Sequence, residues 1–249
     1  MCSVSISTNN LTIGYNNLVV QRDLNFELHP GEMVCILGPN GCGKSTLLRT
    51  LAGLQPALAG SFKIQNSEFL IQNSSIALVL TERLSIENTT VHDVVAMGRY
   101  PYTSFLGGLS AKDEQIIEQS LADVGLSGSA HTFFNDHSDG EKQRTLIAKA
   151  LAQETPIILL DEPTAHLDLP NRIRVLQLLR RVAREQKKTI LISTHELDLA
   201  IKLSDRIMLM TPQQGIQLDS PDKLREQDAF TTAFGMDIFN PNWIKVEKF

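Results

Sequence analysis

Short apolar segments alternate with amphipathic ones along much of this chain. Each short segment is bounded by polar or turn-forming residues, and this pattern is typical of a strand buried on both faces. Between them, apolar residues recur at the spacing of amphipathic helices. The expected strands are 33–37, 157–161, 189–194 and 206–210, and the expected helices are 47–54, about 170–185 and about 196–203. This alternation predicts an α/β fold with a parallel sheet.

The first part of the chain has a different pattern. Leu11, Ile13 and Tyr15 alternate with more polar residues, as do Leu24 and Phe26, and this alternation predicts short strands. We expect further strands at 62–64 and 76–80, so that residues 3–80 form a mixed sheet.

Residues 86–155 are predicted to be a helical insertion. The expected segments are a helix near 91–96, a loop over 98–108, a helix opened by Ser110 and a helix over 140–152. The Tyr- and Pro-rich loop is either a packed surface loop or a docking surface. We therefore expect one domain over 1–249, with a core formed by 3–85 and 156–249 and a helical part formed by 86–155. Residues 221–249 show only a weak pattern of apolar and polar positions, and we assign them no role.

A glycine-rich motif follows the first buried strand and precedes a helix. The motif matches the phosphate-binding pattern G-x-x-x-x-G-K-[ST], whose context must be strand, loop and helix. Glycines let the loop bring its N–H groups close to phosphate oxygens, and the helix N-terminus adds a partial positive charge. Lys44 is expected to reach the β- and γ-phosphates, and Ser45 to hold Mg²⁺. The predicted loop consists of Gly38, Pro39, Asn40, Gly41, Cys42, Gly43, Lys44, Ser45 and Thr46.

Two later strands end in residues with suitable chemistry. Asp161 closes one buried strand and Glu162 follows it, while His195 follows the next strand. In an open α/β sheet, ligands bind at the carboxyl ends of the strands. Asp161 is therefore placed to hold Mg²⁺, and Glu162 to accept a proton from an attacking water. His195 is expected to contact the γ-phosphate.

Composition excludes several classes of protein. The chain has 249 residues, a formal net charge of −5 and 42% hydrophobic residues. This charge argues against nucleic-acid binding driven by bulk charge. The 3 cysteines form no disulfide framework, so a reducing compartment is expected. The N-terminus lacks the features of a signal peptide, and no apolar run is long enough to span a bilayer.

One further stretch, 137–144, begins with a helix-capping signal at Ser138 or Asp139. The chain carries, in order, the phosphate loop, this stretch, the Asp161-Glu162-Pro163-Thr164 segment, Leu167-Asp168 and His195. This order of motifs resembles that of the nucleotide-binding subunits of ABC transporters. The resemblance covers about 11 to 211. It implies a P-loop NTPase (ABC ATPase) core with a parallel sheet, an N-terminal antiparallel β subdomain and an inserted helical subdomain that carries the 138–143 signature.

The resemblance also implies residue roles. Tyr15 would stack on adenine, Glu162 would be the general base, and His195 would be the switch histidine. Asp168 would belong to a loop that crosses a dimer interface. Members of this family hydrolyse ATP as head-to-tail dimers, and the signature residues of one chain would contact the γ-phosphate bound to the other. These signature residues are Ser138, Asp139 and Gly140.

Two departures from the family pattern are visible. Where the family usually has Gln after the strand near residue 80, this chain has Thr81-Glu82. Thr81 is too short to copy that Gln, although Glu82 offers a substitute with a charge. Asp139 stands where the signature has Gly, and His137 where it has Leu or Ile. A carboxylate near a γ-phosphate is unfavourable unless it points away, for example as a helix cap.

Further similarity narrows the expected function. Met97-Gly98-Arg99-Tyr100-Pro101 and Ala165-His166-Leu167-Asp168 resemble the importer ATPases for iron-siderophores, haem and cobalamin. This resemblance implies an ATP- and Mg²⁺-dependent subunit on the cytoplasmic face of the inner membrane. Its partners would be a second copy of itself, integral membrane permease subunits and, indirectly, a substrate-binding protein. The alternatives are a soluble ABC ATPase that acts on ribosomes or DNA, and a catalytically weakened interaction module.

Overall fold

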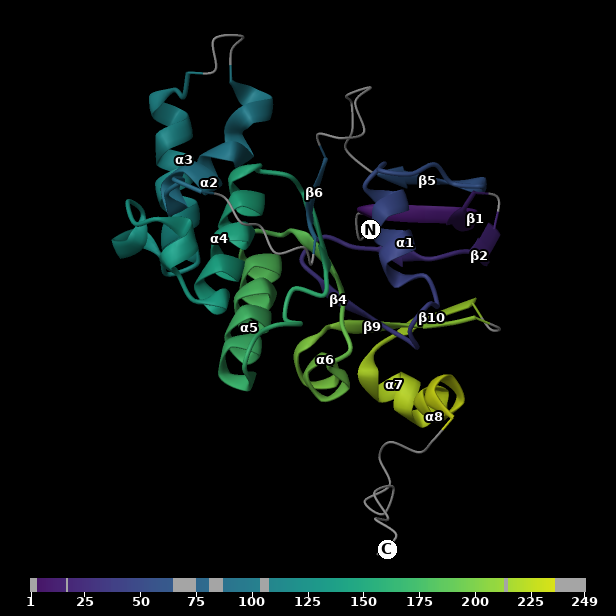
Figure 1. Ribbon diagram of the computed structural model, residues 1–249. Helices are drawn as coiled ribbons and strands as arrows, with labels where there is room; N and C mark the ends of the chain where they lie inside the picture. The colour runs from purple at the N-terminus through teal and green to yellow at the C-terminus, as the bar shows by residue number, and fades with distance from the viewer. Residues whose placement is uncertain are drawn as a thin grey trace, which may run out of the picture.

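The computed structural model describes residues 4–16, 18–64, 75–80, 87–103, 108–212 and 215–235. A sheet of six strands runs through its centre, and helices cover it (Figure 1). In spatial order these strands are β10 (Gly215–Asp219), β9 (Arg206–Thr211), β4 (Met33–Leu37), β8 (Thr189–Ser193), β7 (Ile157–Asp161) and β6 (Ile76–Val79). All neighbours except the β9–β10 pair are parallel, so the predicted parallel α/β core is confirmed.

A second, antiparallel sheet is formed near the N-terminus. Its strands are β1 (Ile6–Tyr15), β2 (Leu18–Leu24), β3 (Glu27–Leu28) and β5 (Ala59–Ile64). β1 pairs with the other three, and every pairing is antiparallel. In Figure 1 this sheet lies on the right with α1 (Lys44–Leu51), on the opposite side of the molecule from α2 (Val91–Ala96), α3 (Ala111–Asp123) and α4 (Asp139–Ala152).

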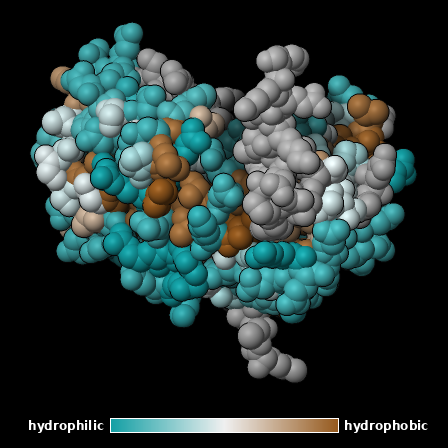
Figure 2. Space-filling view, turned by 90° about the horizontal axis from the view of Figure 1, so that it is seen from below, coloured by the Kyte–Doolittle hydropathy of each residue, from teal (hydrophilic) through white to brown (hydrophobic). Residues whose placement is uncertain are grey.

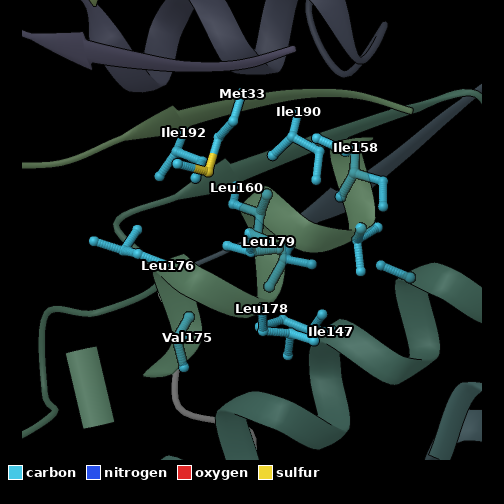
Figure 3. Close-up of a cluster of buried hydrophobic side chains, with 14 of the residues drawn as sticks. Met33, Ile147, Ile158, Leu160, Val175, Leu176, Leu178, Leu179, Ile190 and Ile192 are labelled. Carbon is cyan, nitrogen blue, oxygen red and sulfur yellow. The ribbon is translucent and has the colours of Figure 1, made fainter. Parts of the chain in front are cut away.

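Side chains from the central sheet and two helices form the main core. The strands β4, β7 and β8 are buried at every position, as their runs of consecutive apolar residues predict. Figure 3 shows their residues facing α5 (Leu169–Glu185) and α4. The labelled residues are Met33, Ile147, Ile158, Leu160, Val175, Leu176, Leu178, Leu179, Ile190 and Ile192. This packing fixes the direction in which the strand ends point, and those ends carry the candidate site.

The lower part of the molecule contains α6 (Leu197–Leu203), α7 (Pro221–Glu226) and α8 (Ala229–Phe234) (Figure 1). α6 and α8 add partly buried hydrophobic residues to the main core. Figure 2 shows this face as mostly hydrophilic, with an apolar stripe across its middle. α7 and α8 lie in the stretch for which the sequence pattern gave no assignment.

The expected loop at 98–108 is wrong over its first part. Residues Met97–Tyr102 form a short 3-10 helix, and residues 104–107 lie outside the described part of the chain. Arg99 explains why this segment forms a helical turn. Its side chain is buried, and its Nε donates to Asp113 Oδ1 at 2.8 Å. Its Nη1 donates to the carbonyl of Ala152 at 2.7 Å and to Glu154 at 2.9 Å. A buried guanidinium needs such partners, so this segment is fixed against α3 and the end of α4.

The Asp113 carboxylate predicts how acid affects stability. Hydrogen bonds from the Ser110 hydroxyl and backbone N–H, and from nearby Arg99, lower the pKa of Asp113 from 3.8 to about 2. A lowered pKa stabilises the fold above the unfolded value, and this stabilisation disappears as the pH falls from about 4 toward 2. We expect Asp113→Asn to lose this part of the pH dependence, as measured by urea unfolding between pH 5 and 2. Glu118→Gln, on the exposed face of the same helix, should unfold with the wild-type pH dependence.

Candidate functional site

The glycine-rich loop joins the carboxyl end of β4 to the start of α1. Gly43 is the residue before the helix and has φ of +106°, which favours glycine. A side chain at Gly38 would place its Cβ 2.1 Å from the Met210 carbonyl, so the loop packs directly on β9. The N–H groups at the start of α1 therefore face the edge where β4 ends. This geometry is the one that a phosphate-binding loop requires.

Gln21 holds the loop in place, although no pattern in the sequence pointed to it. Its side chain is buried, and Nε2 donates to the carbonyls of Cys42 and Thr211, each at 2.9 Å. The amide thus connects β2, the loop and β9. Cys42 itself is buried, and burial raises the pKa of its thiol.

Lys44 is the first residue of α1 and lies over the loop. Its side chain is buried, and Nζ donates to the carbonyls of Gly38 at 2.9 Å and Pro39 at 3.1 Å. An ammonium carries three donors. The two carbonyl contacts hold it above the cradle, where phosphate oxygens would come within its reach.

Ser45 and Asp161 come together as the sequence predicts. Ser45 Oγ donates to Asp161 Oδ1 at 3.0 Å, and Ser193 Oγ donates to the same oxygen at 2.6 Å. A hydroxyl and a carboxylate beside a phosphate loop suit Mg²⁺, which prefers oxygen ligands and is often held by one or two protein groups plus substrate phosphates. Within the described ranges, no cluster of three or more His, Cys, Asp or Glu residues could hold a metal alone. A hydroxyl and a carboxylate leave the other coordination positions of Mg²⁺ to water and to nucleotide phosphates.

Glu162 and His195 are directly paired. His195 Nε2 lies 2.5 Å from Glu162 Oε1, and both side chains are partly exposed. The Glu162 N–H donates to the carbonyl of Ser193 at 3.1 Å and to its Oγ at 2.9 Å. Its φ of +46° is unusual for a residue other than glycine, and these contacts hold it there. The carboxylate is thus oriented beside Asp161 at the edge where β7 and β8 end.

Ser138, Asp139 and Gly140 belong to a separate cluster at the start of α4. Ser138 caps the helix, and its N–H and Oγ donate to Glu141 Oε2 at 3.0 and 2.7 Å. These hydrogen bonds lower the pKa of Glu141, with a smaller contribution from His137. A side chain at Gly140 would place its Cβ 2.9 Å from the Asn171 side chain, so the start of α4 packs against the start of α5.

Asp168 and Tyr15 lie elsewhere. Asp168 caps α5, with its side chain accepting from the Asn171 N–H at 3.1 Å. Tyr15 ends β1 and is 43% exposed, which leaves its ring accessible for stacking. No hydrogen bond among the described residues connects either residue, or the Ser138 cluster, to Lys44. Thr81 and Glu82 lie outside the described residues.

Sequence reasoning missed two further contributors. Ser193 follows the apolar residues of β8 as the last residue of that strand, and this buried hydroxyl at a strand end was the available signal. Arg172 pairs with Glu196, the residue after His195, and its Nε donates to the carbonyl of Leu167 at 2.6 Å. This pair connects the start of α5 to the segment that carries His195. Finding it required the three-dimensional arrangement, because charged residues on separate segments give no pairing signal in the sequence.

Comparison with known proteins agrees with this geometry. A profile of the family described as "ABC transporter" matches residues 21–165. An uncharacterized ABC transporter ATP-binding protein of Methanocaldococcus jannaschii is 37% identical over 246 residues, which cover 97% of this chain and 84% of that protein. The petrobactin import ATP-binding protein FpuD of Bacillus anthracis is 34% identical, with 94% of this chain and 87% of that protein covered.

A solved structure shows the same fold. The structure described as an inward-facing conformation of a metal-chelate type ABC transporter has a TM-score of 0.83 and 31% identity, and covers 94% of this chain and 90% of its own. In the part of the chain that the structure describes, no helix is both long and apolar enough to cross a membrane. The phosphate loop and the adjacent carboxylates of Asp161 and Glu162 are consistent with these matches. The chain belongs to the ABC transporter family as an ATP-binding ATPase subunit.

Proposed function

We propose that this chain is the ATP-hydrolysing subunit of an ABC importer for a metal chelate of the iron-siderophore, haem or cobalamin kind. The observation that carries the catalytic part is the continuous hydrogen-bonded set from Ser45 through Asp161 and Ser193 to Glu162 and His195. The chelate class is supported by the petrobactin-importing relative and the metal-chelate type structure.

In this proposal Lys44 and the loop N–H groups bind the phosphates. Ser45 and Asp161 would hold Mg²⁺, and the ion would supply positive charge beside the phosphates. Glu162 accepts the proton of the attacking water, and His195 holds that carboxylate and contacts the γ-phosphate. Tyr15 stacks on the adenine. The other loop residues Gly38, Pro39, Asn40, Gly41, Cys42, Gly43 and Thr46 complete the cradle.

We further propose that two copies pair head to tail on a membrane permease, at the cytoplasmic face of the inner membrane. Ser138, Asp139 and Gly140 of one copy then face the γ-phosphate bound to the other, and Asp168 lies at the interface. Support for a site shared between chains comes from membership of the ABC transporter family, whose nucleotide-binding subunits hydrolyse ATP as head-to-tail dimers. The core is assigned to 3–85 and 156–249, and the helical part to 86–155. A binding protein delivers the chelate to the permease.

Ser138→Asp tests the shared site. Asp is a good helix cap, so α4 should persist, while the added charge would repel a γ-phosphate. We expect ATP hydrolysis to fall by at least about tenfold, because like charges brought together cost several kcal/mol. Binding of ATP to the single chain, measured by calorimetry, should not change.

The matched control is Ser127→Asp, which adds the same charge to an exposed position beyond α3. It should hydrolyse ATP at the wild-type rate. Wild-type hydrolysis by Ser138→Asp would remove Ser138 from the γ-phosphate site and with it the head-to-tail arrangement.

A further inference from the structure

A hollow of about 410 Å³ lies where the end of α3 meets α4 and α5, and the catalytic residues do not line it. We call it the arginine groove. It is lined by Ala122, Asp123, Val124, Gly125, Arg144, Arg174, Gln177, Leu178 and Arg181. Its volume is in the range of small-molecule sites.

Three guanidinium groups line this groove in a chain whose formal net charge is −5. Arg144 comes from α4, whereas Arg174 and Arg181 come from α5. Like charges around one hollow concentrate a positive potential there, and an anion would lower their mutual repulsion. The local charge is thus opposite to that of the whole chain.

Internal contacts leave part of this charge uncompensated. Arg144 Nη1 donates to the carbonyl of Val124 at 3.0 Å, and Arg181 donates to the carbonyl of Asp123. These carbonyls end α3 and carry only a partial negative charge. A guanidinium has five donors, so each of these arginines retains further donors. For Arg174, the described residues provide no hydrogen bond or ion pair, and its side chain is exposed.

Asp123 is the one carboxylate among the lining residues, and it is already engaged. Its Oδ1 accepts from Gln119 Nε2 and its Oδ2 from Gln186 Nε2, each at 2.8 Å. These amides hold the carboxylate in place without adding charge. The groove therefore carries three cationic groups against one carboxylate.

We propose that the arginine groove binds a phosphate-bearing anion with at least two negative charges. A planar guanidinium matches two phosphate oxygens at once, which favours phosphate over a compact anion such as chloride. Gln177 supplies an amide at the same wall. An anion held between Arg144 and Arg174 would connect α4 to α5. The same chemistry is offered by a free polyphosphate and by the headgroup of an anionic phospholipid.

Calorimetric titration with tripolyphosphate tests this site. The background is the full chain with Lys44→Ala, because the phosphate loop also binds phosphate. We expect one equivalent to bind, and Arg174→Gln to weaken its affinity by about tenfold, which is the scale of one hydrogen bond to a charged group. Arg184→Gln removes the same charge from the exposed side of the same helix, where Arg184 pairs with Asp205. It should change the affinity by less than about twofold, because Arg184 does not line the groove and salt screens exposed charges that lie apart.

Vesicle sedimentation distinguishes the two sources of phosphate. Vesicles of equal parts phosphatidylglycerol and phosphatidylcholine are compared with vesicles of phosphatidylcholine alone. Binding to the anionic vesicles that Arg174→Gln weakens and Arg184→Gln does not would identify a headgroup site, and selective binding of tripolyphosphate alone would identify a free anion. The proposal is overturned if neither probe binds, or if Arg174→Gln and Arg184→Gln weaken binding equally.

Discussion

Replacing Glu162 with Gln should stop ATP hydrolysis and leave ATP binding intact. The carboxylate lies 2.5 Å from His195 Nε2 and follows Asp161 at the end of β7. Gln can still accept a hydrogen bond from His195, but it cannot take a proton from water. Removing a general base typically costs about 10²- to 10⁴-fold in rate, and we expect a loss in this range.

Phosphate release measures the rate, and calorimetry with ATP measures binding. ATP-dependent dimers should accumulate on size exclusion, because hydrolysis no longer separates the two copies. Glu185→Gln, at the exposed end of α5, is the matched control and should retain the wild-type rate. If Glu162→Gln hydrolyses ATP within about twofold of the wild-type rate, its role as the base is wrong.

Lys44→Ala should weaken ATP binding by about a hundredfold or more. The ammonium is held over the loop by the carbonyls of Gly38 and Pro39, so it is already positioned before a nucleotide arrives. A hydrogen bond between charged groups is worth about 1.5–3 kcal/mol, and the β- and γ-phosphates would offer two. Calorimetry with a non-hydrolysable ATP analogue measures the loss.

The control for this prediction is Lys63→Ala, which removes an exposed lysine from β5. Its affinity for the analogue should equal that of the wild-type chain. Should Lys44→Ala bind the analogue within about threefold of wild type, the assignment of the phosphate loop fails.

The local pattern of apolar and polar residues predicts the central sheet and the phosphate loop of this protein. β4, β7 and β8 each contain a run of consecutive apolar residues, and the glycine-rich motif stands between a strand and a helix, so the sequence alone places the loop at a strand end. Asp161, Glu162 and His195 follow from the rule that ligands bind at the carboxyl ends of parallel strands. The observed sheet brings these ends together, because β7 and β8 are direct neighbours with Asp161 opposite Ser193.

Contacts between distant segments were beyond the sequence pattern. Ser193 reaches Asp161 only because of the β7–β8 register, and Gln21 reaches Cys42 only because β2 packs beside the loop. The 3-10 helix at Met97–Tyr102 depends on Arg99 being buried against the end of α4. Periodicity reports which face of an element is apolar, whereas these contacts depend on how the elements meet in space.

Co-purification from native membranes tests most directly whether this chain powers a transporter. Tagged chain carrying Glu162→Gln, incubated with ATP, is recovered from detergent-solubilised membranes, and its partners are identified and quantified. We predict that a polytopic permease is recovered in an amount equal to that of the chain. If binding to the permease depends on bound ATP, tagged chain carrying Lys44→Ala should recover less of this permease. Recovery with ribosomes or nucleic acid, or of the chain alone, would contradict the importer assignment.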